Sequence, residues 1–176
     1  MALTDKLTAI GNAIRAKTGK SGKLTLEQMV TEIGSIGGSS LMLYAGGYEF
    51  SVTGGWSAVS GTLTKNVSEL AYYSGTANSI RYATTVNAID FSGYKTLRIR
   101  CRKSNNAGTA ANYTVGLSTA RGSGIVAEYQ VTYSTNTNHW VDIDLSALDL
   151  SKKMYVFIKC GGTSNYVTYV SAVYAE

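Results

Sequence analysis

Apolar residues at the start of the chain recur with the period of an α-helix. Between residues 3 and 17 they follow one another at spacings of 4, 3 and 4: Leu3, Leu7, Ile10 and Ile14. This spacing is that of a heptad seam. A helix of about 14 residues is marginal alone in water, so its apolar stripe needs a partner. The stripe is narrow enough to suit a copy of itself, and we expect these four side chains at an oligomer interface.

A second short helix is predicted after a glycine-lysine turn. Thr25 is a good N-cap, and Gln28 three residues later completes a capping box. Leu24 and Met29 lie where a hydrophobic staple forms. The chain therefore opens with an α-helical hairpin over residues 1–36, which we interpret as an oligomerisation and attachment module.

The rest of the chain changes from a period of 3.6 to a period of 2. Apolar or aromatic residues alternate with polar ones in eight or more short segments, which are separated by glycine, asparagine and serine. This pattern predicts a mainly β fold, an antiparallel β-sandwich of jelly-roll type over residues 45–176. Residues 37–44 are expected to link it to the helical hairpin.

Cysteine and histidine are too sparse for a metal site. Cys101 and Cys160 each alternate with apolar residues, which favours two reduced core thiols and leaves a disulfide between neighbouring strands as the alternative. Together with His139, the only histidine, they make no ligand cluster. We expect no metal, no cofactor and no catalytic residue.

Basic residues are densest on one face of a predicted strand, at Arg98, Arg100 and Arg102, in a chain of net charge +5. Binding of an anionic glycan is one interpretation of this stripe. Nucleic acid is disfavoured because no recognition motif accompanies the charge. The favoured alternative is a solvated sheet face on which the arginines pair with acids of neighbouring strands: Glu128, Asp142 or Asp144.

Tyrosine dominates the aromatic residues, with 13 tyrosines against 3 phenylalanines and 2 tryptophans. Its ring stacks and its hydroxyl makes hydrogen bonds, which suits contact with sugars or proteins. Many tyrosines of a β-protein are nevertheless core residues. The candidates for ligand binding, beside the three arginines, lie near predicted loops: Tyr72, Tyr73, Tyr82 and Tyr166.

Tyr155 and Phe157 share one face of a strand whose other face is already apolar through Met154, Val156 and Ile158. If the second set faces the core, the first pair lies on another buried surface or in the open. A subunit interface accounts for this best, and a ligand platform is the alternative.

The N-terminal residues also carry a resemblance. The run Ala13-Ile-Arg-Ala-Lys-Thr-Gly19, followed by Leu24-Thr-Leu-Glu-Gln-Met29 and Ile33, resembles a recurring N-terminal module of tail and baseplate proteins from phages of Gram-positive bacteria. The chain departs from that module at Ala16, where an acid is usual, and at Val30. The resemblance implies an oligomeric virion component that links a receptor-facing domain to the tail.

A second resemblance concerns the predicted sandwich. The segments Ala88–Ile99, Trp140–Leu148 and Lys153–Ile158 are similar to segments of galactose-binding-like and carbohydrate-binding-module sandwiches. The similarity implies the fold and transfers no site residue, because ligand residues in such sandwiches vary.

These observations together predict a phage tail or baseplate protein, located in the virion and made in the bacterial host cytoplasm. We expect a homotrimer that contacts other tail or baseplate proteins and binds a host cell-surface saccharide by multivalency. The alternatives are a structural virion protein without a ligand and an enzyme that degrades surface polysaccharide, although we expect no enzyme activity. No apolar run of 18 residues and no secretory signal occur, so membrane insertion is not expected.

Overall fold

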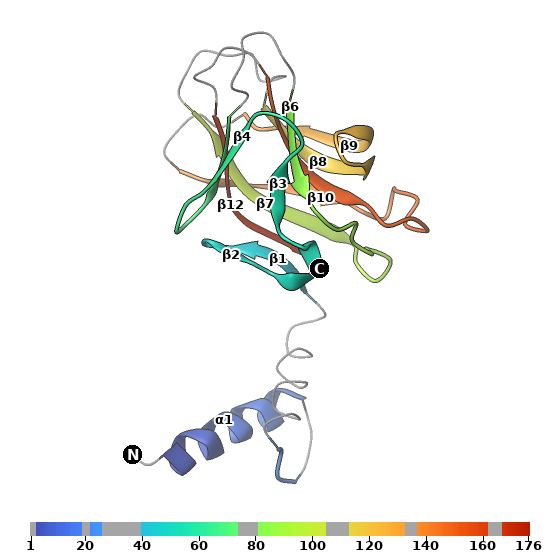
Figure 1. Cartoon of the computed structure of the whole chain (residues 1–176). Coiled ribbons are helices and arrows are strands. Elements are labelled where there is room, and N and C mark those ends of the chain that lie inside the picture. The colour runs from blue at the N-terminus through green and yellow to red at the C-terminus, as the bar shows by residue number, and fades with distance from the viewer. Residues whose placement is uncertain are drawn as a thin grey trace. The chain divides into compact units, whose positions relative to one another are not determined.

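The computed structural model describes residues 3–18, 22–25, 40–73, 81–104, 113–132, 137–161 and 167–176 (Figure 1). The chain divides into two compact units, Met1–Ser40 and Leu41–Glu176, which are described separately below. Among the described residues, no helix combines the length and the apolar character needed to cross a membrane.

The first unit contains helix α1, Leu3–Thr18, which agrees with the first predicted helix. Ile14 is 3% exposed in the single chain and has little surface left for another copy, whereas Ile10 is 46% exposed. Leu7 is partly exposed, and the side chain of Leu3 is outside the described set. Gln28 and the remainder of the predicted second helix also lie outside the described residues.

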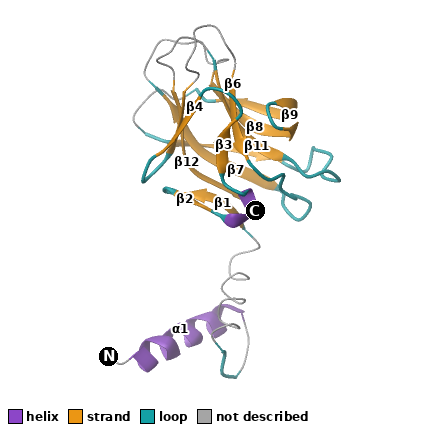
Figure 2. Ribbon diagram, viewed as in Figure 1, coloured by secondary structure: helices purple, strands orange, loops and turns teal. Residues whose placement is uncertain are grey.

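The second unit is a sandwich of two antiparallel sheets (Figure 2). Among the described residues, seven strands form one sheet: β1 (Leu41–Ala45), β2 (Tyr48–Glu49), β4 (Thr62–Lys65), β5 (Leu70–Tyr73), β7 (Thr96–Lys103), β10 (His139–Asp144) and β12 (Val167–Ala175). Their order is β10-β7-β12-β1-β2, and β5 pairs with both β12 and β4. A 3-10 helix, Ser51–Thr53, follows β2.

The other sheet has the order β3-β6-β11-β8-β9. Its strands are β3 (Trp56–Ala58), β6 (Arg81–Thr85), β8 (Tyr113–Ala120), β9 (Ser123–Gln130) and β11 (Tyr155–Cys160). Leu117 pairs with Ala127, but the next residue of β8, Ser118, pairs with Ile125, so the β8–β9 register shifts there by one residue. Val126 is therefore an extra residue on β9, a β-bulge. The predicted mainly β sandwich, preceded in the sequence by an N-terminal helix, is confirmed.

The sandwich begins earlier than the sequence pattern indicated. Residues 41–44, which we assigned to the linker, belong to β1, and Leu43 is fully buried. β1 pairs with the C-terminal half of β12 through contacts such as Leu41 with Ala175. Pairing with the far end of the chain decides this boundary, and no local signal reports it.

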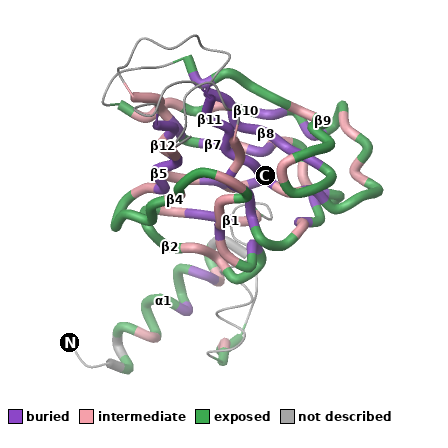
Figure 3. The backbone as a smooth tube through the Cα atoms, turned by 45° about the horizontal axis from the view of Figure 1, so that its top comes forward, coloured by how far each residue is buried: buried purple, intermediate pink, exposed green. Residues whose placement is uncertain are grey.

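The core lies between the sheets and follows the alternation of the strands (Figure 3). Leu97, Ile99 and Cys101 of β7 point inward, as do Val156 and Ile158 of β11. Each alternate residue therefore faces away from the core, which creates an outer face on each sheet.

Both cysteines are buried, reduced thiols that belong to opposite sheets, Cys101 on β7 and Cys160 on β11. Removal from water raises the pKa of the Cys101 thiol to about 12, because burial disfavours the thiolate. The predicted reduced core thiols are confirmed.

The outer face of the five-stranded sheet is itself covered by side chains of the same chain. Phe157 points away from the core and is nevertheless 0% exposed, with its ring edge-on to Tyr82 at a centroid distance of 5.8 Å. Phe157 therefore lies on a second buried surface within one chain, and its expected place at a subunit interface is wrong. Tyr155, on the same face, is partly exposed.

Gly116 of β8 lies beside Phe157 in the ladder. A Cβ atom at Gly116 would lie 2.0 Å from the carbonyl oxygen of Ala127 and 2.8 Å from the Cζ atom of Phe157. The absence of a side chain there allows the Phe157 ring and the β9 backbone to approach β8 closely.

We predict that Gly116→Ala lowers the free energy of unfolding by about 1–3 kcal/mol, because the added methyl group must displace a ring and a backbone carbonyl. Urea unfolding measures this change. Gly93→Ala is the matched control, because a Cβ atom there meets no atom within 4 Å. Equal effects of the two substitutions would contradict the close approach at Gly116.

Candidate functional site

The predicted arginine stripe lies on the outer face of the seven-stranded sheet. The Nε atom of Arg98 donates to the Oδ1 atom of Asp142 at 2.9 Å, and its Nη1 atom donates to the Tyr174 hydroxyl at 3.1 Å. The guanidinium also lies 5.1 Å from the ring centroid of Trp140. Arg98 is thus held by a carboxylate and two aromatic residues of neighbouring strands.

Arg102 is held in the same manner. Its Nη2 atom lies 2.8 Å from Glu69 Oε1, both side chains are 16% exposed, and its guanidinium lies 3.6 Å from the Tyr169 ring centroid. Arg100 is exposed, with its guanidinium 6.0 Å from the Trp140 ring. For Arg98 and Arg102 the interpretation as ion-paired outer-face residues is therefore confirmed, although Glu69 was not among the expected partners.

The other two expected acids have different partners. Asp144 accepts hydrogen bonds from the backbone N–H and the hydroxyl of Ser146, and these hydrogen bonds lower the pKa of the Asp144 carboxyl. Glu128 lies on β9, in the opposite sheet from the arginines.

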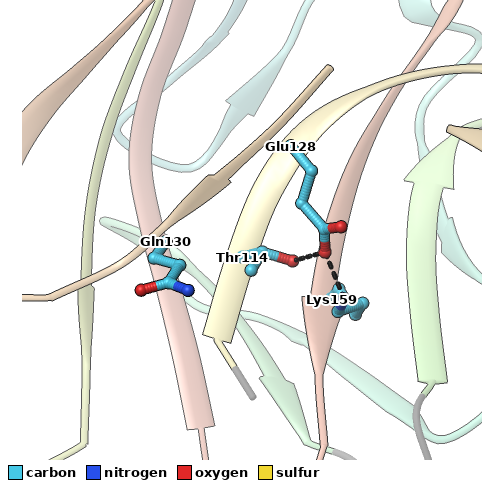
Figure 4. Close-up of a pocket in the computed structure, with 4 residues that line it drawn as sticks. All are labelled: Thr114, Glu128, Gln130 and Lys159. Atoms are coloured by element: carbon cyan, nitrogen blue, oxygen red, sulfur yellow. Dashed lines mark hydrogen bonds and ion pairs between the residues drawn. The ribbon is translucent and has the colours of Figure 1, made fainter. Parts of the chain in front are cut away.

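A polar pocket opens on the outer face of the five-stranded sheet (Figure 4). It has a volume of about 220 Å³ and is lined by Thr114 of β8, Glu128 and Gln130 of β9, and Lys159 of β11. The strand register assembles it, because Lys159 lies opposite Thr114 and Thr114 lies opposite Gln130. Glu128 lies opposite Gly116, which is two residues after Thr114 on β8.

A charge pair occupies the centre of this pocket. The Lys159 ammonium donates a hydrogen bond to Glu128 Oε1, and the Thr114 hydroxyl donates to the same oxygen at 2.7 Å. Lys159 is only 8% exposed, so its charge depends on this carboxylate for compensation. Figure 4 shows the Glu128 carboxylate between the Thr114 hydroxyl and Lys159, with the Gln130 amide on the far side of Thr114.

Opposing influences act on the protonation of Glu128. Burial raises its pKa, but the hydrogen bonds from Lys159 and Thr114 and the charge of Lys159 outweigh burial, so the pKa of Glu128 is lowered overall. Glu128 therefore remains a carboxylate, and an acceptor of hydrogen bonds, at neutral pH.

Tyr82 adds an aromatic ring to the same face. It lies opposite Lys159 in the β6–β11 ladder and is partly exposed, with its ring against Phe157. The Nε atom of Arg121, from the β8–β9 turn, donates to Thr84 Oγ1 of β6 at 3.0 Å. The same guanidinium also hydrogen-bonds the Ser57 hydroxyl of β3. These two hydrogen bonds fix the β8–β9 turn to β6 and β3.

The other tyrosine candidates do not join this face. Tyr72 is fully buried in the core, and its hydroxyl donates to the Ser60 carbonyl at 2.5 Å, so the expectation that it contacts a ligand is wrong. Tyr73 is partly exposed at the end of β5, in the seven-stranded sheet. Tyr166 lies outside the described residues. Of the predicted ligand-binding residues that the structure describes, Tyr82 alone lies on the face that holds the pocket.

Sequence reasoning did not bring together the four described residues that line the pocket, and it named Glu128 only as a possible partner of the arginines. One signal was present, since Lys159 is the only charged residue of the apolar strand β11, on a face otherwise formed by Tyr155 and Phe157. Among the described residues, no group of three or more His, Cys, Asp or Glu side chains is placed to hold a metal ion.

Comparisons with known proteins concern the fold. No protein-family model matches the chain, and no curated protein matches it. A family 29 carbohydrate-binding module from Piromyces equi is similar in structure, with a TM-score of 0.50 and 11% identity over 77% of this chain and 89% of that module. A family 11 carbohydrate-binding module from Clostridium thermocellum, solved with a β-1,3-1,4-mixed-linked tetrasaccharide, has a TM-score of 0.51 and 14% identity over 77% and 94%. The chain thus has the β-sandwich fold of carbohydrate-binding modules.

The charge pair makes stability depend on pH. Folding lowers the pKa of Glu128, so the ionised carboxylate stabilises the folded chain. This stabilisation is complete above the pKa of an unfolded glutamate, about 4.3, and is lost as the pH falls through the folded-state pKa. We predict that the unfolding free energy of the wild-type chain exceeds that of Glu128→Gln at neutral pH and that the difference shrinks below about pH 4. Urea unfolding of both chains over this range measures it, and a difference that grows on acidification would contradict the pairing.

Proposed function

We propose that this chain is a saccharide-binding protein and that its site is the outer face of the five-stranded sheet. The observation that carries the proposal is the polar pocket of Thr114, Glu128, Gln130 and Lys159 beside the partly exposed ring of Tyr82. Sites for small ligands combine a concave surface, an aromatic wall and a few placed polar groups.

The chemistry of the pocket suits a sugar. Each sugar hydroxyl both donates and accepts hydrogen bonds, and the pocket offers a carboxylate acceptor, ammonium and amide donors and a hydroxyl. The tyrosine ring supplies an apolar surface for the C–H groups of a pyranose. At about 220 Å³ the pocket is below the range of roughly 300–1,000 Å³ typical of drug-sized ligands, so one sugar unit of a longer chain is the expected occupant.

The fold supports this assignment in a general way. The family 11 module with a similar fold was solved with a bound tetrasaccharide, and that ligand is a property of that module. For the present chain, its own pocket residues support saccharide binding.

We propose that the pocket binds a saccharide and does not hydrolyse it. A glycosidase needs a carboxylic acid that can donate a proton to the leaving oxygen, which requires a raised pKa. The pKa of Glu128 is lowered, and its carboxylate is engaged by Lys159. It is therefore suited to accept hydrogen bonds from hydroxyl groups and unsuited to act as a general acid.

We further propose that the sandwich serves host recognition in a phage tail or baseplate. The support is the resemblance of residues 13–33 to the N-terminal module of such proteins, together with helix α1 and the half-exposed Ile10. Trimerisation through this module would present three weak sites together, and avidity would compensate for a shallow pocket.

The site is tested by isothermal titration with soluble polysaccharides, beginning with mixed-linkage β-1,3-1,4-glucan and galactan. We predict that Tyr82→Ala and Gln130→Ala each weaken binding about tenfold, because a stacking ring or a hydrogen bond contributes on the order of 1 kcal/mol. Tyr48→Ala is the matched control, since Tyr48 is 64% exposed and lies on the seven-stranded sheet. Absence of binding to host cell-wall material would favour the purely structural alternative.

Light scattering tests the role of the first unit. We predict that the full chain has about three times the 18.7 kDa chain mass, and that a chain starting at Leu41 is a monomer because it retains its own core. A full chain that stays monomeric at tens of micromolar would contradict trimerisation. Assembly that survives removal of residues 1–40 would contradict the role given to the helix.

A further inference from the structure

The pocket on the five-stranded sheet contains charged groups that compensate each other. Of the four described residues that line it, Lys159 and Glu128 are charged, and they form an ion pair. The Lys159 side chain is 10% exposed and the Glu128 side chain 31% exposed, so the carboxylate is the more accessible of the two to a ligand. We infer that the saccharide bound here is uncharged and that the Glu128–Lys159 pair excludes acidic sugars; this inference rests on the proposed function of the same pocket.

The positions of the two groups support this. Lys159 and Thr114 both donate to Oε1 of Glu128. Among the described residues this leaves Oε2 of the same carboxylate as an acceptor for a ligand hydroxyl. An acidic sugar would instead bring a second carboxylate next to Glu128. In a partly desolvated pocket that like-charge contact is unfavourable, and the ammonium that could offset it is already shared with Glu128.

Three arginines outside the pocket are engaged by other residues. Arg121 hydrogen-bonds Thr84 and Ser57 across the same sheet. Arg98 and Arg102 are ion-paired on the opposite sheet, so their charges do not face the pocket. The anionic glycan that the arginine stripe suggests in the sequence is therefore not the ligand that this pocket fits.

The decisive variant is Glu128→Gln, which keeps the shape and the acceptor for Lys159 while removing the negative charge. The probes are mixed-linkage β-glucan and galactan as neutral polymers, and polygalacturonate and alginate as acidic ones. We expect the wild-type chain to bind a neutral polymer at least about tenfold more tightly than either acidic one. In Glu128→Gln, affinity for the acidic polymers should rise about tenfold, because the ammonium gains a carboxylate partner from the ligand.

Two further variants identify the source of the gain. Glu128→Gln combined with Lys159→Met removes both charges, and the gain for acidic polymers should disappear. Glu69→Gln is the matched control: it also removes a carboxylate from an ion pair, but releases Arg102 on the other sheet. Circular dichroism confirms that each variant is folded, and the double variant, which leaves no unpaired charge, keeps the comparison valid if one single variant fails to fold.

The possible results separate this inference from the proposed function. Tight binding of acidic polymers by the wild-type chain, weakened by Tyr82→Ala, would overturn the inference and leave saccharide binding at this face intact. An equal gain in Glu69→Gln and Glu128→Gln would also overturn it, because net charge alone would explain the change. Binding of neither class, or binding indifferent to Tyr82→Ala, would overturn the proposed function itself.

Discussion

The packing of Phe157 beside Gly116 is the constraint on which the outer face of the five-stranded sheet depends. β11 lies at the centre of that sheet and is buried on both sides, by the core on one and by its own outer-face neighbours on the other. The missing Cβ atom at Gly116 lets the ring and the β9 backbone come close. It also leaves the space beside Glu128 without a side chain on β8, and the carboxylate of Glu128 contacts Lys159 and Thr114 in the neighbouring row.

The two outer faces of the sandwich use charge differently. On the seven-stranded sheet, Arg98 and Arg102 lie against aromatic rings and form exposed or partly exposed ion pairs. Their partners are Asp142 of β10 and Glu69, the residue before β5. Such pairs contribute modestly to stability, and Arg100 is exposed on the same face. On the five-stranded sheet a nearly buried ammonium shares one carboxylate with a threonine hydroxyl. Burial and a specific charge partner together mark that second arrangement as the functional candidate.

Local pattern was enough to predict the fold and too little to predict the site. The period-2 alternation in residues 97–101 and 154–160 predicted which side chains enter the core, because a strand has only two faces. The boundary at Leu41 and the burial of Phe157 depend on pairing between distant segments, which no single strand reports. The three arginines were predicted as ligand-binding residues because they lie close together on one strand. Glu128 and Lys159 are 31 residues apart and became partners only through strand register.

The β-bulge at Val126 has a consequence for how this protein can change over time. Side chains on a strand alternate, so the offset between the β8–β9 turn and Glu128 decides whether Glu128 and Gln130 face outward or inward. The bulge takes up Val126 as an extra residue, so Ile125 lies opposite Ser118 and Glu128 still lies opposite Gly116. If the same residues paired without a bulge, Glu128 and Gln130 would turn toward the hydrophobic interior. A hairpin that lacked Val126 would keep Glu128 opposite Gly116 in a regular ladder, so descendants can lose this one residue and still vary their ligand by substitution along β9.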